Sequence, residues 1–294
     1  MLNSAIIEFK LIRKYKITWI LFSLFLILLI YSMIFSIMEV QKLDNQIFQV
    51  LSHSTPSDGK IDISQPLGEL KELAKVINPL ALVNNNLILL IMIGSILFGI
   101  FGAVLVGSEF KQRTVQIRAS HYGWAQSVGS KLILLFLVAV MMSIFVSIVS
   151  YVEGYFSLLW AKKELHQNEV IGLETININV FYQMVIASFT LFFYGTLGLI
   201  FSLITRSTLV GGIIAFLVPY IERFFANFSL EYLFPTTWIG VLIEHNFLIF
   251  QNSFARPTIL TNVEISPIMS LILILLLNIV LSIFSFYFSK KQIV

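Results

Sequence analysis

The chain has 294 residues, of which 57% are hydrophobic and only 12% are charged. Average soluble domains carry about 25% charged residues, so this composition excludes a single soluble core. The chain contains no cysteine, which excludes disulfides and thiolate metal sites.

Residues 1–16 mix bulky apolar residues with basic ones, in the order MLNSAIIEFKLIRKYK. This mixture predicts a helix that lies at the cytosolic membrane interface. A short basic tail that only orients the chain is the alternative interpretation.

Uncharged runs of about 20 residues, the length a helix needs to cross the hydrocarbon core, follow this segment. Five runs are continuous and lie at residues 17–38, 87–106, 132–152, 180–204 and 267–288. A sixth run, residues 209–228, is interrupted by Glu222 and Arg223. We therefore expect an all-α polytopic membrane protein, with six transmembrane helices in a single domain over residues 1–294.

The lysine and arginine residues orient these spans. If both termini are cytosolic, the inner segments hold eleven of the 19 basic residues but only two of the 16 acidic ones. The opposite orientation reverses this bias, so we expect both termini in the cytosol.

Residues 39–85 follow the first span and contain the turn cluster Ser-Thr-Pro-Ser-Asp-Gly at positions 54–59. After the turn, Leu67, Leu70, Leu73 and Ile77 recur at helical spacing. This pattern predicts an outer helical hairpin that rests on the membrane part.

Small residues form two stripes with a spacing of four. The second span carries Ser95, Gly99, Ala103 and Gly107, and the start of the fifth carries Ser207, Gly211 and Ala215. Small faces allow helix backbones to approach closely in lipid, so we expect both stripes to pack against helices. Packing within one subunit and a dimer seam are both compatible with this pattern.

No Asp, Glu, Lys, Arg or His falls within the five continuous runs. Ionisable groups inside membrane helices mark proton relays, ion sites and intramembrane catalysis. Their absence argues against an ion-coupled carrier, a charged cation pore and an intramembrane protease. An uncoupled passive pore is still compatible with the sequence.

Residues 107–131, GSEFKQRTVQIRASHYGWAQSVGSK, form a basic cytosolic segment between the second and third spans. Written as a helix, this segment places Glu109 and Arg113 on one polar face and Phe110 and Ile117 on an adjacent apolar strip. Such a mixed surface is typical of a helix that docks into a partner's groove. A solvated loop that only fixes the orientation is the alternative.

The fifth span carries Glu222 about 22 Å along a helix that starts at Ser207, in the outer part of the hydrocarbon core. Pro219 can kink this helix just before the carboxylate. Two interpretations are open. Pro219, Glu222 and Arg223 line an outward cavity in a broken helix, or a short span ends near Tyr220.

Residues 229–266 form the last outer segment, in which residues 238–250 are apolar except for Glu244, His245 and Asn246. This stretch is too short to cross the bilayer. We expect a re-entrant segment that dips into the outer leaflet or lies upon it.

Motifs for catalysis or metal binding are missing from the sequence. The four histidines stand in four separate segments without metal-ligand spacing. No P-loop with the required spacing and no G-x-S-x-G elbow occurs. We therefore expect no metal site, no bound cofactor and no enzymatic activity in this chain.

The layout resembles the permease subunits of ABC-2 type exporters, which have six spans, a cytosolic interfacial helix and a loop before the third span. Three loop residues match the family pattern, namely Glu109, Thr114 and Lys131. The loop departs from the pattern at Arg113 in place of Gly, Ser120-His121 in place of Pro and Trp124 in place of Arg. Further matches are Gly198, Ser202, Arg206, Ser207, Phe234-Pro235 and the tail from Phe286 to Lys291, after which Gln292 stands where Asp is frequent.

This resemblance implies two six-span permeases, identical or homologous, with cytosolic ABC ATPase subunits that bind ATP and Mg²⁺ on separate chains. Residues 109–119 would be the coupling helix, with ATPase contacts at Glu109, Phe110, Arg113, Thr114, Ile117 and Arg118. The expected location is a bacterial plasma membrane, with lipids as partners and without nucleic acid.

The large outer hairpin resembles permeases of lantibiotic-immunity and bacitracin-type systems. The resemblance therefore implies export of an amphipathic peptide, an antibiotic or a lipid-like substrate from the membrane or the cytosol. A non-transport membrane scaffold or sensor that binds a peptide through its outer segments is the alternative function.

Overall fold

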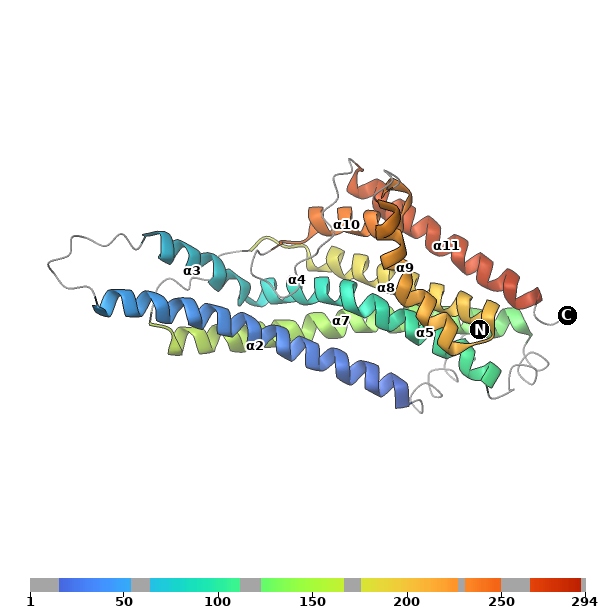
Figure 1. Ribbon diagram of the computed structural model, residues 1–294, viewed down its shortest axis with the longest axis horizontal. Helices are drawn as coiled ribbons and strands as arrows, with labels where there is room; N and C mark the ends of the chain where they lie inside the picture. The colour runs from blue at the N-terminus through green and yellow to red at the C-terminus, as the bar shows by residue number, and fades with distance from the viewer. Residues whose placement is uncertain are drawn as a thin grey trace.

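The computed structural model describes residues 16–53, 64–111, 123–166, 176–226, 231–249 and 265–291, and these residues form helices without strands. Most of the helices run along the long axis of an elongated molecule (Figure 1). Five described helices are long and apolar enough to cross a membrane. The chain is therefore an all-helical, multi-pass membrane protein.

Five long helical segments form the membrane part. They are α2 (Lys16–His53), a continuous rod of α4 (Pro79–Leu89), the π-helical turn η1 (Leu90–Gly94) and α5 (Ser95–Lys111), then α7 (Trp124–Glu164), α8 (Val180–Thr205) and α11 (Pro267–Lys291). The shorter elements are α3 (Ser64–Val76), α9 (Thr208–Ala226), the 3-10 turn η3 (Glu231–Leu233) and α10 (Pro235–Asn246).

The sixth expected span corresponds to α9, which is shorter than the other five. Pro219 lies inside α9, and the apolar part of this helix ends at Glu222. Helix length thus identifies five spans, and it leaves the position of the termini open. Residues 1–15 of the expected interfacial helix and the turn cluster at 54–59 lie outside the described residues.

α2 and α7 are much longer than a bilayer requires. Their 38 and 41 residues measure about 57 Å and about 62 Å, compared with about 30 Å of hydrocarbon. Beyond the membrane part, they pack with α3 around Val40, Leu70, Ile77 and Leu158. We call this region the hairpin end. The opposite region, where α5 ends at Lys111 and α8 ends at Thr205, is the loop end (Figure 1).

α5 and α8 cross with their backbones in contact. A Cβ added to Gly102 would overlap the carbonyl oxygen of Gly195, and one added to Gly198 would overlap that of Gly99. Glycine is therefore required at this crossing, because a side chain on either helix would push the two backbones apart.

α9 packs onto the same pair of helices. Arg206 ends α8 with a left-handed φ of 54°, so the chain reverses and α9 begins two residues later. A Cβ on Gly211 would lie 2.7 Å from the backbone nitrogen of Ser202, and one on Gly99 would lie 2.8 Å from the Cβ of Ala215. Ser95 and Ala103 are also buried, so most small residues of the two stripes lie in contacts within this chain.

We expect Gly211→Ala to lower the free energy of unfolding by about 1–3 kcal/mol, because its Cβ would overlap the backbone of α8. Gly212→Ala is the matched control, since the nearest atom to its Cβ is 3.8 Å away on Ile100. That control should be neutral or slightly stabilising, because alanine favours helix more than glycine does. Thermal unfolding in nanodiscs measures both, and equal effects of the two substitutions would contradict the close crossing.

Candidate functional site

A buried ion pair joins the end of α5 to the start of α7 at the loop end. Lys131 Nζ lies 2.8 Å from Glu109 Oε1 and also donates a 3.1 Å hydrogen bond to Ser127 Oγ. The side chains of Lys131 and Glu109 are 1% and 5% exposed. The pair therefore joins the two ends of the basic segment. Its central residues 112–122 lie outside the described ones.

Apolar packing holds the two helix ends together around this pair. Val106 and Val128, each three positions before a charged partner, share one buried cluster with Leu199 and Leu203 of α8. Half-buried Phe110 packs against the same cluster. A buried charge is costly unless an opposite charge lies beside it. The ion pair and the cluster together therefore fix α5 relative to α7.

Two of the expected docking residues, Glu109 and Phe110, do not lie on the exposed helical faces that the sequence predicts. Glu109 points to Lys131 inside the protein, so it is not part of an exposed polar face. Phe110 is half-buried in the apolar cluster at this end. The remaining expected contacts, Arg113, Thr114, Ile117 and Arg118, lie outside the described residues.

Glu222 caps α10 from inside the protein. Its Oε2 accepts a 3.0 Å hydrogen bond from the backbone N–H of Thr236, and its side chain is buried. Phe234 offers no side-chain cap to α10, so the carboxylate supplies an acceptor and a negative charge at the helix N-terminus. Pro219 lies one turn earlier in α9, and the side chain of Arg223 is not among the described ones.

The expected re-entrant segment folds into the protein interior. Residues 236–243 of α10 are all buried, and the helix lies against α11 and α8 (Figure 1). Trp238 Nε1 donates a 2.8 Å hydrogen bond to the carbonyl of Tyr232, which fixes the turn into α10. This burial explains why the stretch is apolar although it is too short to cross.

Asn84 and Gln183 form a polar clamp that the sequence analysis did not identify. Asn84 donates to the carbonyl of Leu248 at 2.7 Å and accepts from its N–H at 3.0 Å. Gln183 Nε2 donates to Asn84 Oδ1 and to the carbonyl of Asn246, each at 2.8 Å. The two amides thus hold the chain after α10, and the Asn triplet at 84–86 was the sequence signal.

A second polar cluster connects α4 to α7. Asn86 Nδ2 donates to Ser150 Oγ at 2.9 Å and to Glu153 Oε2 at 3.3 Å. Asn86 is fully buried, and its Oδ1 has no hydrogen-bond partner among the described residues. Glu153 follows directly after the third uncharged run, residues 132–152.

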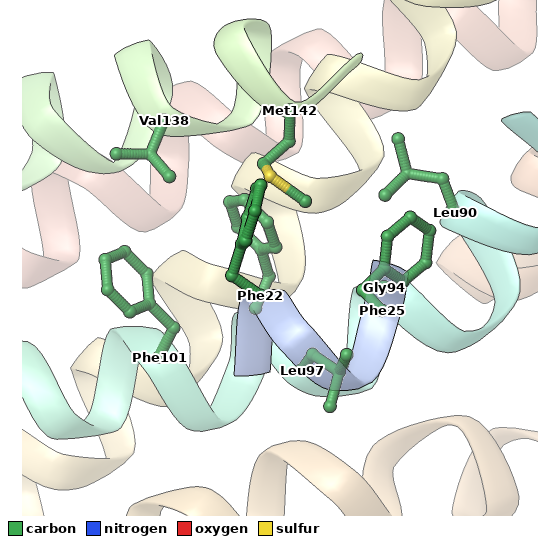
Figure 2. A pocket seen from close by; sticks show the side chains of 9 residues that line it. Phe22, Phe25, Leu90, Gly94, Leu97, Phe101, Val138 and Met142 are labelled. Carbon is green, nitrogen blue, oxygen red and sulfur yellow. The ribbon is translucent and has the colours of Figure 1, made fainter. Parts of the chain in front are cut away.

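An apolar cavity of about 90 Å³ lies between α2, α5 and α7 (Figure 2). Its lining side chains carry no nitrogen or oxygen, so the cavity suits part of a hydrocarbon chain better than water. The π-helical turn η1 contributes to its wall. The lining residues are Phe22, Phe25, Leu90, Gly94, Leu97, Phe98, Phe101, Val138 and Met142.

Neither metal chemistry nor known relatives add to this description. Across the described ranges, no three His, Cys, Asp or Glu side chains gather as a metal site. No family model, curated protein or solved structure matches the chain. The function must therefore be argued from the chain's own residues.

We expect Lys131→Met to lower the free energy of unfolding by about 3–5 kcal/mol, because it removes the counter-charge of a buried carboxylate. The double substitution Glu109→Leu/Lys131→Met should recover much of this loss, since neither charge is then buried.

The exposed pair of Glu72 and Lys75, 2.7 Å apart, provides the control. Glu72→Gln should cost at most about 1 kcal/mol, because water screens this pair. Denaturant unfolding in mixed micelles compares the variants. A double variant no more stable than Lys131→Met would contradict the energetic pairing.

Proposed function

We propose that the chain is the membrane permease subunit of an ABC-2 type exporter that a separate cytosolic ATPase drives. In this proposal α9 is the fifth of six spans, and the loop end and both termini face the cytosol. A second permease, identical or homologous, completes the pathway, and the ATPase subunits bind ATP and Mg²⁺. The cargo is an amphipathic peptide, an antibiotic or a lipid-like molecule, and the location is a bacterial plasma membrane.

The Glu109–Lys131 ion pair is the observation that carries this proposal. These residues are the Glu and the Lys of the ABC-2-like loop pattern, and they meet at 2.8 Å although 22 positions separate them. Because the pair ties residues 109 and 131 together, a partner that moves residues 112–122 would pull on α5 and α7 at once. A coupling loop needs this connection to transmit force into the membrane part.

The distribution of charged residues supports an external source of energy. α4, η1 and α8 contain no Asp, Glu, Lys, Arg or His, and α11 has none before Lys290. The buried charges of α5 and α7, Glu109 and Lys131, neutralise each other at the loop end. Ion-coupled carriers place ionisable side chains along the substrate path, and α4, η1 and α8 offer none. The buried carboxylate of α9, Glu222, accepts the N–H of Thr236 at the start of α10.

We expect Arg113→Ala/Arg118→Ala to weaken retention of the ATPase about tenfold, because it removes two charges that would hold the partner in register. Lys162→Ala/Lys163→Ala is the matched control, since it removes two basic residues at the opposite end of α7. Co-purification with the ATPase and ATP hydrolysis in proteoliposomes are the measurements. Equal retention by both variants would contradict the coupling role, and pumping driven by a proton gradient alone would overturn the proposal.

A peptide-binding scaffold or sensor is the second candidate, and the hairpin end favours it. α2, α3 and α7 form a buried cluster of their own there, and Phe48 and Phe156 lie exposed on α2 and α7. Such a projecting helical unit with aromatic side chains suits peptide recognition. A chain that binds peptide through this end and never retains an ATPase would favour the scaffold over the permease.

A further inference from the structure

Glu153 stands where α7 leaves its uncharged run. It follows Lys131 by 22 positions, or about 33 Å along the helix, which is close to the thickness of the hydrocarbon core. The neighbouring Tyr151 and Tyr155 are 52% and 53% exposed. Exposed tyrosines at this spacing are typical of the interfacial belt, which would place Glu153 at the level of the lipid headgroups.

The carboxylate of Glu153 has no counter-charge among the residues that the structure describes. It accepts a hydrogen bond from Asn86 Nδ2, and it forms no ion pair with any residue in the described ranges. Its side chain is partly buried, so water solvates it incompletely. A half-buried carboxylate in this position would be stabilised by a cation that reaches it from the membrane surface.

Asn86 adds an unused acceptor beside this charge. The amide that donates to Glu153 and Ser150 has its oxygen, Oδ1, buried without a hydrogen-bond partner among the described residues. Among the described residues, the cluster therefore has an acceptor without a donor, Asn86 Oδ1, beside the negative charge of Glu153. A primary ammonium group brings one positive charge and three N–H donors, which match this combination.

The cluster is held by two helices in direct contact. A Cβ on Gly154 would overlap the Cα of Pro79, so the start of α4 lies against α7 one residue from Glu153. Side chains on a helix point toward its N-terminus, which directs Glu153 back along α7 toward Asn86. The arrangement therefore exists before a ligand binds, because rigid helices position both side chains.

We propose that Glu153 and Asn86 bind the primary ammonium group of a membrane lipid headgroup, such as that of phosphatidylethanolamine. The lipid is the source because Glu153 is partly exposed and would lie at headgroup depth, where lipid ammonium groups are concentrated. A free alkylamine presents the same chemistry from solution. This site goes beyond the proposed transport function and does not depend on it.

The test compares nanodiscs that contain phosphatidylethanolamine with nanodiscs that contain phosphatidylcholine, at the same acyl chains and anionic lipid content. Phosphatidylcholine has a quaternary ammonium without N–H donors. The wild-type Tm should be about 2–4 °C higher in phosphatidylethanolamine, and Glu153→Gln should abolish this difference. Glu164→Gln, on an exposed residue of the same helix, should retain it.

Octylamine and octanol, added to phosphatidylcholine nanodiscs, separate the two sources of ammonium. A wild-type Tm shift with octylamine but not with octanol supports ammonium recognition. A shift with octylamine and none with phosphatidylethanolamine would overturn the lipid as the source. The same lipid preference in Glu153→Gln as in the wild type would overturn the site, and because no ATPase is present, that result would leave the transport proposal intact.

Discussion

Backbone contact between α5 and α8 is the constraint on which the rest of the structure depends. In lipid, apolar side chains gain little from leaving hydrocarbon, so helices associate through dense packing and hydrogen bonds. The glycines of both helices, which face each other's carbonyl groups, supply that packing. Since Arg206 reverses the chain within two residues, α9 then lies in the groove beside this crossing. The crossing thereby sets where Glu222 meets α10, because α9 carries that carboxylate to Thr236.

The segment after α9 shows how this membrane protein accommodates irregular backbone. Hydrocarbon cannot satisfy backbone N–H and C=O groups, so a short helix and its flanking turns need partners within the protein. Glu222 provides an acceptor at the start of α10, and Asn84 pairs with both backbone groups of Leu248 after its end. Gln183 holds the carbonyl of Asn246 from α8. α10 can therefore be buried among the long helices.

The apolar runs predict which parts of the chain form the long helices. Charged side chains are costly in hydrocarbon, so they are missing from the runs that form these helices. The runs do not predict where those helices end. α2 continues to His53, since no Gly or Pro interrupts the polar residues that follow its apolar part. Side-chain partners are still less accessible to sequence reasoning. Glu109 and Lys131 were both recognised, but their meeting depends on how α5 and α7 pack, and Asn84 meets Leu248 across 164 positions.

The described helices fall into two groups that differ in how their members are joined, and the groups pack against each other through α7 and α8. α5, α8 and α9 are joined by their small residues, whereas α2, α3 and α7 share the cluster at the hairpin end. Between the groups, α2 borders the apolar cavity, where packing against α5 is incomplete (Figure 2). The ion pair at the loop end is a strong local link, because it ties α5 of the first group to α7 of the second. A displacement of the basic segment would therefore reach both groups from one point, and the long α7 would carry it to the hairpin end.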